Sequence, residues 1–275
     1  MQHLPRPRKR FGQNFLQDPS VLEGIVHAIR PQKGERVIEI GPGRGALTRE
    51  LLSCIPSLEA IELDRDLCAY LKQTFKPEQL ILYSQDVLSF DFAAHAAKVP
   101  ETPLLRLVGN LPYNLSSVLM LKWVQTPECI KDIHIMLQKE VIERLGAQPS
   151  TSAYSRLSIA VQTVFEVEPL FEVPPTAFFP APKVNSMVAR LTPHRPSEML
   201  RFQCNRGILE LVLQMAFGQR RKMLSNSLKA LPAPLEWSAW GIDPQRRPES
   251  LSLDEWVGLV RQLEPVWPSA QDSAE

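Results

Sequence analysis

The residues of this chain that could do chemistry follow short apolar runs, and the first of them form a glycine-rich turn. Residues 37–40 are apolar apart from one glutamate, and they lead into Gly41, Gly43 and Gly45. Glycines permit positive φ angles and let a ligand approach the backbone closely. The spacing differs from the G-x-G-x-x-G of dinucleotide-binding proteins, and Pro42 removes an amide that a pyrophosphate would use. We expect Gly41 and Gly43 to line a ligand site; a ligand-free tight turn is the alternative.

Two carboxylates follow the next two apolar runs. Glu62 ends the run 58–63, about 20 residues after the glycines, where a carboxylate can accept hydrogen bonds from both hydroxyls of a ribose. Asp86 lies just after the run 80–83 and can accept a hydrogen bond from an adenine amino group, while Val87 packs on the ring. The alternative for Glu62 is a solvated carboxylate at a strand end, and the alternative for Asp86 is an ordinary loop carboxylate.

Asn110, Leu111, Pro112 and Tyr113 follow a fourth apolar run, over 104–108. An amide oxygen and an aromatic face, on a backbone fixed by proline, suit an exocyclic amine on a planar base. The side-chain oxygen of Asn110 and the carbonyl of Leu111 would accept the two hydrogens of that amine. An ordinary proline turn with a packed tyrosine is the alternative, which the position at a strand end disfavours.

The elements that must position these residues alternate along the chain. Strands are expected at residues 36–40, 58–63, 80–83, 104–108 and 133–137, and helices at 46–53, 65–75, 90–98, 116–124 and 139–145. This alternation predicts βαβ units and a mostly parallel α/β sheet. Because the carboxyl ends of parallel strands meet at one edge, all four motifs are expected there.

The pattern changes near residue 195. Two further strands are expected at 165–173 and 184–191, and only helical patterns follow Pro193 to Pro196. Residues 200–217, 219–230 and 253–263 carry these helical patterns. We therefore predict a domain of residues 1–195, which begins with a basic arm over 1–17, and a small all-helical domain over 196–275.

Composition excludes several classes of protein. The four cysteines and five histidines form no C-x-x-C or H-E-x-x-H pattern, so we expect no metal site. No apolar run reaches the roughly 18 residues of a membrane helix, and no signal-peptide core follows the basic N-terminus, so we expect a cytoplasmic protein. The chain has 31 basic and 30 acidic residues, a net charge of +1, which at first disfavours nucleic-acid binding.

The distribution of charge is more informative than its sum. Residues 1–17 and residues 217–230 each contain four basic residues and no acid. Arginine and lysine clusters contact nucleic-acid phosphates, although many are simply solvated. The predicted RNA-contacting residues are Arg6, Arg8, Lys9, Arg10, Arg220, Arg221 and Lys222.

Taken together, the motifs resemble those of Rossmann-like S-adenosylmethionine-dependent methyltransferases, and more narrowly the ribosomal RNA adenine N6,N6-dimethyltransferase family. The resemblance covers nearly the whole chain. Its matching segments lie at residues 8–16, 37–48, 61–64, 110–113, 136–140, 178–184 and 217–226. Within the family, the long helical tail is most similar to the bacterial branch that acts on small-subunit rRNA.

The resemblance implies an activity and a set of roles. The activity is methyl transfer from S-adenosylmethionine to N6 of two adjacent adenosines near the 3′ end of 16S rRNA in the 30S subunit or its precursor, by a monomeric enzyme. The implied roles are Asn14 and Leu16 in an arm that closes over the cofactor, Gly41 beside its methionine part, Glu62 at its ribose, Asp86 at its adenine, Asn110 beside the methyl group, and Phe178 as a second aromatic at the target base.

Three other functions remain open on the residues alone. A dinucleotide-dependent oxidoreductase is disfavoured by the glycine spacing. A DNA adenine methyltransferase usually carries two prolines before its aromatic residue, whereas this chain has Leu111 before Pro112. A non-catalytic RNA-binding assembly factor would not need an intact Asn110 to Tyr113 segment.

Overall fold

The computed structural model describes residues 5–8, 12–102, 104–112, 115–219, 222–231, 237 and 241–267. The chain divides into two compact units. The first unit comprises Met1–Ile142 and Glu166–Pro193, and the second comprises Glu143–Phe165 and His194–Glu275. The second unit therefore also takes in residues 143–165, which the sequence prediction assigned to the first domain.

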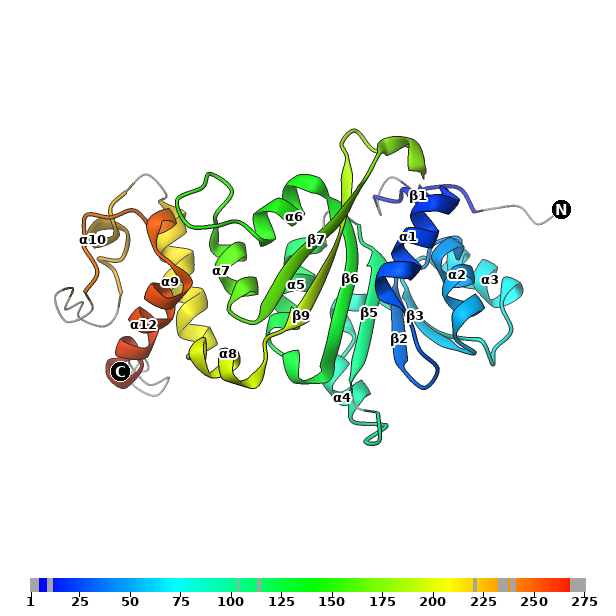
Figure 1. The fold of residues 1–275 in the computed structure, drawn as a ribbon, viewed down its shortest axis with the longest axis horizontal. Helices are drawn as coiled ribbons and strands as arrows, with labels where there is room; N and C mark the ends of the chain where they lie inside the picture. Colours follow the sequence, from blue (N-terminus) through cyan, green and yellow to red (C-terminus); the bar gives the residue numbers. More distant parts are fainter. Residues whose placement is uncertain are drawn as a thin grey trace. The chain divides into compact units, whose positions relative to one another are not determined.

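A seven-stranded sheet forms the centre of the first unit (Figure 1). The strands are β2 (Arg36–Ile40), β3 (Leu58–Glu62), β4 (Leu80–Ser84), β5 (Leu105–Asn110), β6 (Ile130–Gln138), β7 (Phe165–Val173) and β9 (Ser186–Pro193). Their order is β4-β3-β2-β5-β6-β9-β7. The first five strands in this order pair in parallel, as predicted, and β9 pairs antiparallel to β6.

The order of strands reverses beside β2. The chain runs outward from β2 through β3 to β4, and then returns to the other side of β2 as β5. The chain segments that follow β2 and β5 lead away in opposite directions, and this leaves a crevice outside the carboxyl ends of the two strands. Open α/β sheets bind their ligands in such a crevice. The glycine turn follows β2 and Asn110 ends β5, so both lie at this crevice.

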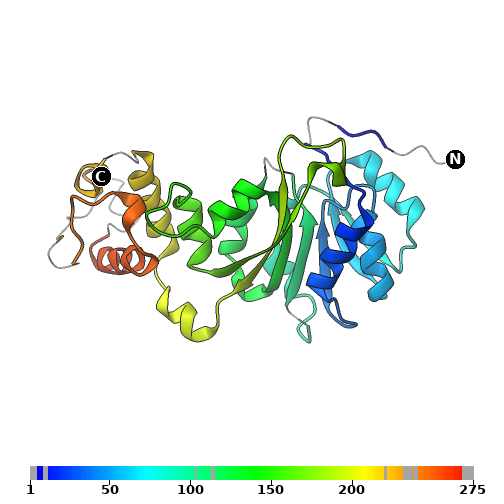
Figure 2. The same cartoon turned by 45° about the horizontal axis from the view of Figure 1, so that its top comes forward.

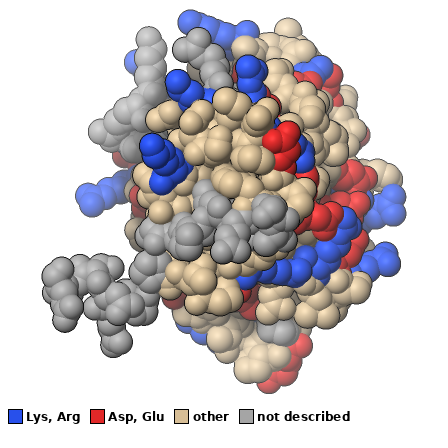
Figure 3. Space-filling model, turned by 90° about the vertical axis from the view of Figure 1, so that its left-hand side faces the viewer, with Lys and Arg blue, Asp and Glu red and all other residues tan. Residues whose placement is uncertain are grey.

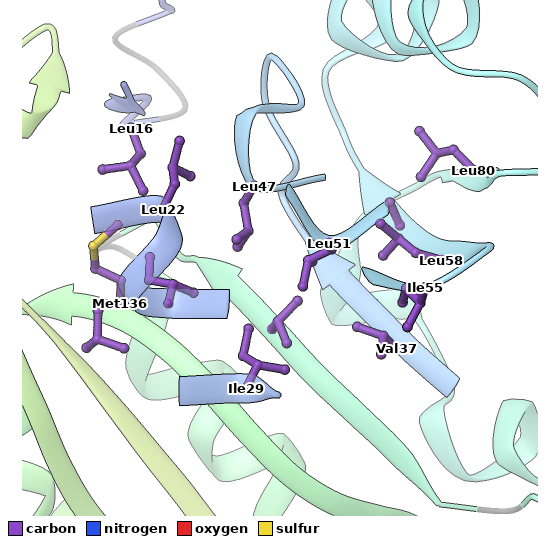
Figure 4. Close-up of a cluster of buried hydrophobic side chains, with 14 of the residues drawn as sticks. Leu16, Leu22, Ile29, Val37, Leu47, Leu51, Ile55, Leu58, Leu80 and Met136 are labelled. Carbon is purple, nitrogen blue, oxygen red and sulfur yellow. The ribbon is translucent and has the colours of Figure 1, made fainter. Parts of the chain in front are cut away.

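Helices pack on the sheet through regular apolar spacing. The helices of this part of the chain are α1 (Pro19–Ile29), α2 (Ala46–Cys54), α3 (Arg65–Thr74), α4 (Phe92–Ala96), α5 (Ser116–Val124) and α6 (Lys139–Leu145). Asp18 caps α1 by accepting hydrogen bonds from the Ser20 and Val21 amides, and Pro19 occupies its first position. Figure 4 shows side chains of α1 and α2 meeting apolar strand residues in a buried cluster.

A two-stranded ribbon joins the arm to the loop after β7, and the sequence did not predict it. β1 (Phe15–Leu16) pairs antiparallel with β8 (Phe178–Phe179), and the two lie side by side in Figures 1 and 2. The Gln17 amide extends the ladder by donating to the Ala177 carbonyl at 2.8 Å. Residues 15–17 of the arm are thus paired with a segment that lies far away in the sequence.

The second unit, in the part of the chain that is described, is helical. Its helices are α7 (Arg156–Gln162), α8 (Pro196–Arg201), α9 (Arg206–Gly218), α10 (Leu224–Ser227) and α12 (Leu253–Leu263). The helix expected over 200–217 begins later, as α9, and the one expected over 219–230 is reduced to α10. The helix expected over 253–263 agrees with α12, whereas α7 was not predicted. No helix among the described residues is long and apolar enough to cross a membrane.

A buried ion-pair network fastens the end of α1 to the sheet. Arg106 on β5 donates from Nη2 to Asp132 Oδ2 at 2.8 Å and from Nη1 to Glu35 Oε2 at 2.7 Å. The same Nη2 donates to the Ile29 carbonyl at 2.6 Å, in the last turn of α1. Burial opposes ionisation of Asp132, but the contacts with His134 and Arg106 outweigh it and lower its pKa to about 2.

Replacing Arg106 should destabilise the protein strongly. Arg106→Met leaves Asp132 as a buried charge without its partner, and we expect a loss of about 3–5 kcal/mol in the free energy of unfolding. Urea unfolding at pH 7 measures this loss. The matched control is Arg190→Met, because Arg190 pairs with Glu168 at the surface, where such pairs contribute about 0–1 kcal/mol. Equal losses in the two variants would contradict the structural role given to Arg106.

Candidate active site

A cavity of about 200 Å³ lies at the carboxyl ends of the strands in the first unit. Its walls include every residue that the sequence predicted for the cofactor, and also Leu111 and Pro112. The predicted cofactor residues are Asn14, Leu16, Gly41, Gly43, Glu62, Asp86 and Asn110. Residues from five separate segments of the chain therefore meet at one place, as the parallel sheet requires.

Both carboxyl oxygens of Glu62 accept hydrogen bonds from backbone amides. It is buried at the end of β3, and its Oε2 accepts a hydrogen bond from the Gly43 amide at 3.2 Å. Its Oε1 accepts from the Asp64 amide at 2.9 Å. Burial raises the pKa of Glu62, while these hydrogen bonds act in the opposite direction. A carboxylate has about four acceptor positions, so positions remain for the hydroxyl groups of a ligand.

The arm lies directly on the glycine turn. Gly43 has φ of +58°, and a Cβ atom there would lie 3.0 Å from the Phe15 ring. The Arg44 guanidinium lies over the same ring at 4.4 Å from its centroid, and its Nη2 donates to the Pro5 carbonyl at 2.7 Å. Phe15 therefore closes one side of the cavity, although the sequence gave no role to it.

The side chain of Asp64, which follows β3, contacts two residues of the arm. Arg8 forms ion pairs with Asp64 and Asp66, and Gln13 Nε2 donates to Asp64 Oδ2 at 3.2 Å. The charge of Arg8, which was predicted to contact RNA, is thus engaged within the protein. Arg6 is exposed. The other arm residues of that prediction, Lys9 and Arg10, lie outside the described residues.

The side chain of Asn110 is oriented by the arm. Its Nδ2 donates to the main-chain carbonyl of Asn14 at 2.9 Å. Because a carbonyl can only accept, this contact identifies the nitrogen of the amide, and no donor among the described residues bonds to Oδ1. Gly109 precedes it, and a Cβ atom there would lie 2.5 Å from the Ile40 carbonyl oxygen, so β5 can approach β2 this closely only with glycine.

Of the two aromatic residues expected at the target base, only Phe178 is among the described residues. Tyr113 lies outside the described residues. Phe178 is 5% exposed and packs in the apolar cluster that contains Leu16 and Met136, and it is not among the residues that line the cavity. The next residue, Phe179, is 52% exposed. The role of Phe178 at a base stays a prediction.

Glu39 is a cavity residue that the sequence interpretation missed, although a single acid in an apolar strand was a usable signal. It is buried on β2, lines the cavity and accepts a hydrogen bond from Thr48 Oγ1 at 2.6 Å. Burial raises its pKa to about 7, reinforced by the charge of Glu62 and opposed by the Thr48 hydrogen bond. The cavity thus holds a carboxyl group that titrates near neutral pH.

The chemistry of the cavity fits S-adenosylmethionine. Glu39, Glu62 and Asp86 present carboxyl oxygens, while Ile61 and Val87 supply apolar walls. A cationic ligand with ribose hydroxyls and amino groups needs acceptors of this kind beside apolar surface for its adenine. In the described part of the chain, no group of three or more His, Cys, Asp or Glu residues could hold a metal ion.

Glu39 should make stability depend on pH. Its raised pKa means that the unfolded chain loses the proton near pH 4.5 while the folded protein keeps it to about pH 7. Stability therefore falls as pH rises through this window. Relative to Glu39→Gln, the wild type should lose about 2–3 kcal/mol between pH 5 and pH 8. Thermal unfolding of both proteins without ligand checks this, and a constant difference across the window would contradict it.

Comparisons with known proteins agree with this site. A family model described as ribosomal RNA adenine dimethylase matches residues 5–264. A protein of Nitrosococcus oceani named Ribosomal RNA small subunit methyltransferase A is 50% identical over 267 residues, which are 97% of this chain and 98% of that protein. A protein of Thiobacillus denitrificans with the same name is 48% identical over 257 residues, 94% of this chain and 98% of that protein.

Solved structures share the fold. A dimethyladenosine transferase from Plasmodium falciparum matches with a TM-score of 0.75 and 24% identity, over 91% of this chain and 97% of that chain. The 23S rRNA methyltransferase ErmE matches with a TM-score of 0.64 and 23% identity, over 91% of this chain and 100% of that chain. The predicted Rossmann-like methyltransferase fold is confirmed, and with the family match over most of its length the chain belongs to the ribosomal RNA adenine dimethylase family.

Proposed function

We propose that this protein transfers methyl groups from S-adenosylmethionine to N6 of two adjacent adenosines near the 3′ end of 16S rRNA. The product is N6,N6-dimethyladenosine, and the substrate is the 30S subunit or its precursor. The enzyme acts in small-subunit biogenesis as a cytoplasmic monomer. The family membership supports the reaction. The observation that carries it is the orientation of Asn110, a residue that lines the cavity and whose Oδ1 bonds to no donor among the described residues.

Asn110 and Leu111 position the reacting amine. Adenine N6 is a poor nucleophile because its lone pair is delocalised into the ring. Asn110 Oδ1 and the Leu111 carbonyl accept hydrogen bonds from the two N–H groups of this amine. These bonds draw the nitrogen toward a pyramidal geometry and direct its lone pair into the cavity. The bond from Asn110 to Asn14 holds the amide in place beforehand, so little reorganisation is needed during the reaction.

The remaining residues hold the two reactants together. When bound, S-adenosylmethionine supplies a methyl group that its positively charged sulfur makes electrophilic. Glu62 holds the ribose and Asp86 the adenine amino group, while Gly41 and Gly43 allow close approach along the methionine part. The rate gain then comes chiefly from proximity and orientation.

The adenine ring reaches Asn110 only if the nucleotide leaves its stack. Unstacking costs a few kcal/mol, and stacking on aromatic side chains returns about 1–3 kcal/mol per base. Tyr113 and Phe178 are the aromatic residues that we assign to this task, on the strength of the family resemblance.

Basic residues of the second unit are the proposed contacts to rRNA phosphates. Lys222 and Lys229 are exposed, and among the described residues neither forms an ion pair. Arg220 and Arg221 lie outside the described residues. Figure 3 shows basic side chains on one face of the molecule, with acidic side chains among them. Others are neutralised within the protein, such as Arg201 by Asp254 and Arg246 by Glu255.

Asn110→Ala should separate binding from chemistry. We expect S-adenosylmethionine to bind with less than about a fivefold loss of affinity, whereas methyl transfer should fall by at least about 100-fold, because an interaction needed in the transition state is removed. The assay is labelled methyl transfer to undermethylated 30S subunits, followed by digestion to count N6,N6-dimethyladenosine. Large-subunit RNA and DNA are the control substrates. Near wild-type transfer by this variant would overturn the assignment.

Neutralising Arg220, Arg221 and Lys222 should weaken binding to 30S subunits and reduce its salt dependence. Each lost phosphate contact lowers the slope of log affinity against log salt concentration by about 0.7–0.9. Calorimetry should show unchanged affinity for S-adenosylmethionine. The matched control is neutralisation of Arg201 and Arg246, which are already paired with acids. Identical slopes in the two variants would argue against this RNA surface.

A further inference from the structure

We propose that the loop of residues 179–185 binds the nucleotide next to the target adenosine. In this proposal Phe179 stacks on the neighbouring base, and Lys183 contacts a phosphate. The inference rests on the proposed function, because it assumes an RNA substrate, and it adds a contact that methyl transfer itself does not require.

The register of the β1–β8 ribbon sets the direction of Phe179. Phe15 lies opposite Phe179, and Leu16 lies opposite Phe178. Directly opposed residues of an antiparallel pair share one face, and successive residues alternate between faces. Leu16 and Phe178 both belong to the buried apolar cluster, so Phe15 and Phe179 occupy the other face. On that face Phe15 covers the glycine turn, whereas Phe179 is 52% exposed.

The ribbon lies close to Asn110. Asn110 donates to the carbonyl of Asn14, the residue that precedes Phe15 in the ribbon. Phe179 pairs with Phe15, and Phe15 directly follows Asn14, whose carbonyl accepts the hydrogen bond from Asn110. It does not line the cavity itself. A base that stacks on Phe179 stays at the mouth of the site, while the target base must enter to reach Asn110.

The rest of the loop suits a nucleotide better than an apolar partner. Lys183 and Val184 are exposed, and among the described residues Lys183 forms no ion pair. Pro180 and Pro182 restrict the backbone between the aromatic residue and the cation, so less freedom is lost when a ligand binds. An aromatic face with a nearby cation is the usual combination for binding single-stranded nucleic acid.

The test compares aromatic and non-aromatic residues at position 179. Phe179→Ala should weaken binding to undermethylated 30S subunits by about tenfold, within the range for loss of one base–aromatic stack, and Phe179→Tyr should bind like the wild type. The matched control is Ile81→Ala, because Ile81 is exposed to a similar extent, 47%, on the edge strand β4. Calorimetric affinity for S-adenosylmethionine should stay unchanged in all three variants.

Lys183→Gln supplies an independent measurement. It should reduce the slope of log affinity against log salt concentration by about 0.7, the value for one phosphate on a single strand, whereas Phe179→Ala should leave that slope unchanged. The proposal is overturned if Phe179→Ala binds 30S subunits as tightly as Ile81→Ala does. Failure of the proposed function is distinguishable, because the wild type would then form no N6,N6-dimethyladenosine in the same particles.

Discussion

The buried carboxylate of Glu62 is the interaction on which the site depends. A buried charge is tolerated only when it is hydrogen-bonded, and Glu62 obtains its bonds from the amides of Gly43 and Asp64. The first bond holds the turn after β2 in a conformation that needs glycine, and this leaves room for the Phe15 ring. The second fixes Asp64, whose side chain receives Arg8 and Gln13 of the arm. The wall of the cavity and the placement of the arm therefore share one charged group.

The features that the sequence predicted correctly have local causes. The predicted helix of residues 65–75 forms as α3, which Asp64 caps with a hydrogen bond that reaches only two residues, and the strands of the parallel sheet are short apolar runs. Because the carboxyl ends of parallel strands lie at one edge of the sheet, the residues that follow these strands come together in one site. The prediction of a cavity that joins Gly43, Glu62 and Asn110 needed only these two steps.

The features that the sequence did not predict depend on contacts between distant segments. β1 and β8 are two residues long and lie more than 160 positions apart, so neither carries a periodic signal of its own. Whether Phe178 or Phe179 faces the core is decided by the register of this pairing, since one step changes the face. The assignment of residues 143–165 to the second unit likewise follows from packing rather than from a change in composition.

The β1–β8 pairing has a consequence for how parts of the site are coupled. The arm provides part of the cavity wall, and its Asn14 carbonyl accepts a hydrogen bond from the Asn110 amide. The same arm is paired with the segment of Phe178 and Phe179. One short segment therefore contacts the cavity, the amide of Asn110 and the strand of these two aromatic residues, so a displacement of the arm would alter all three together.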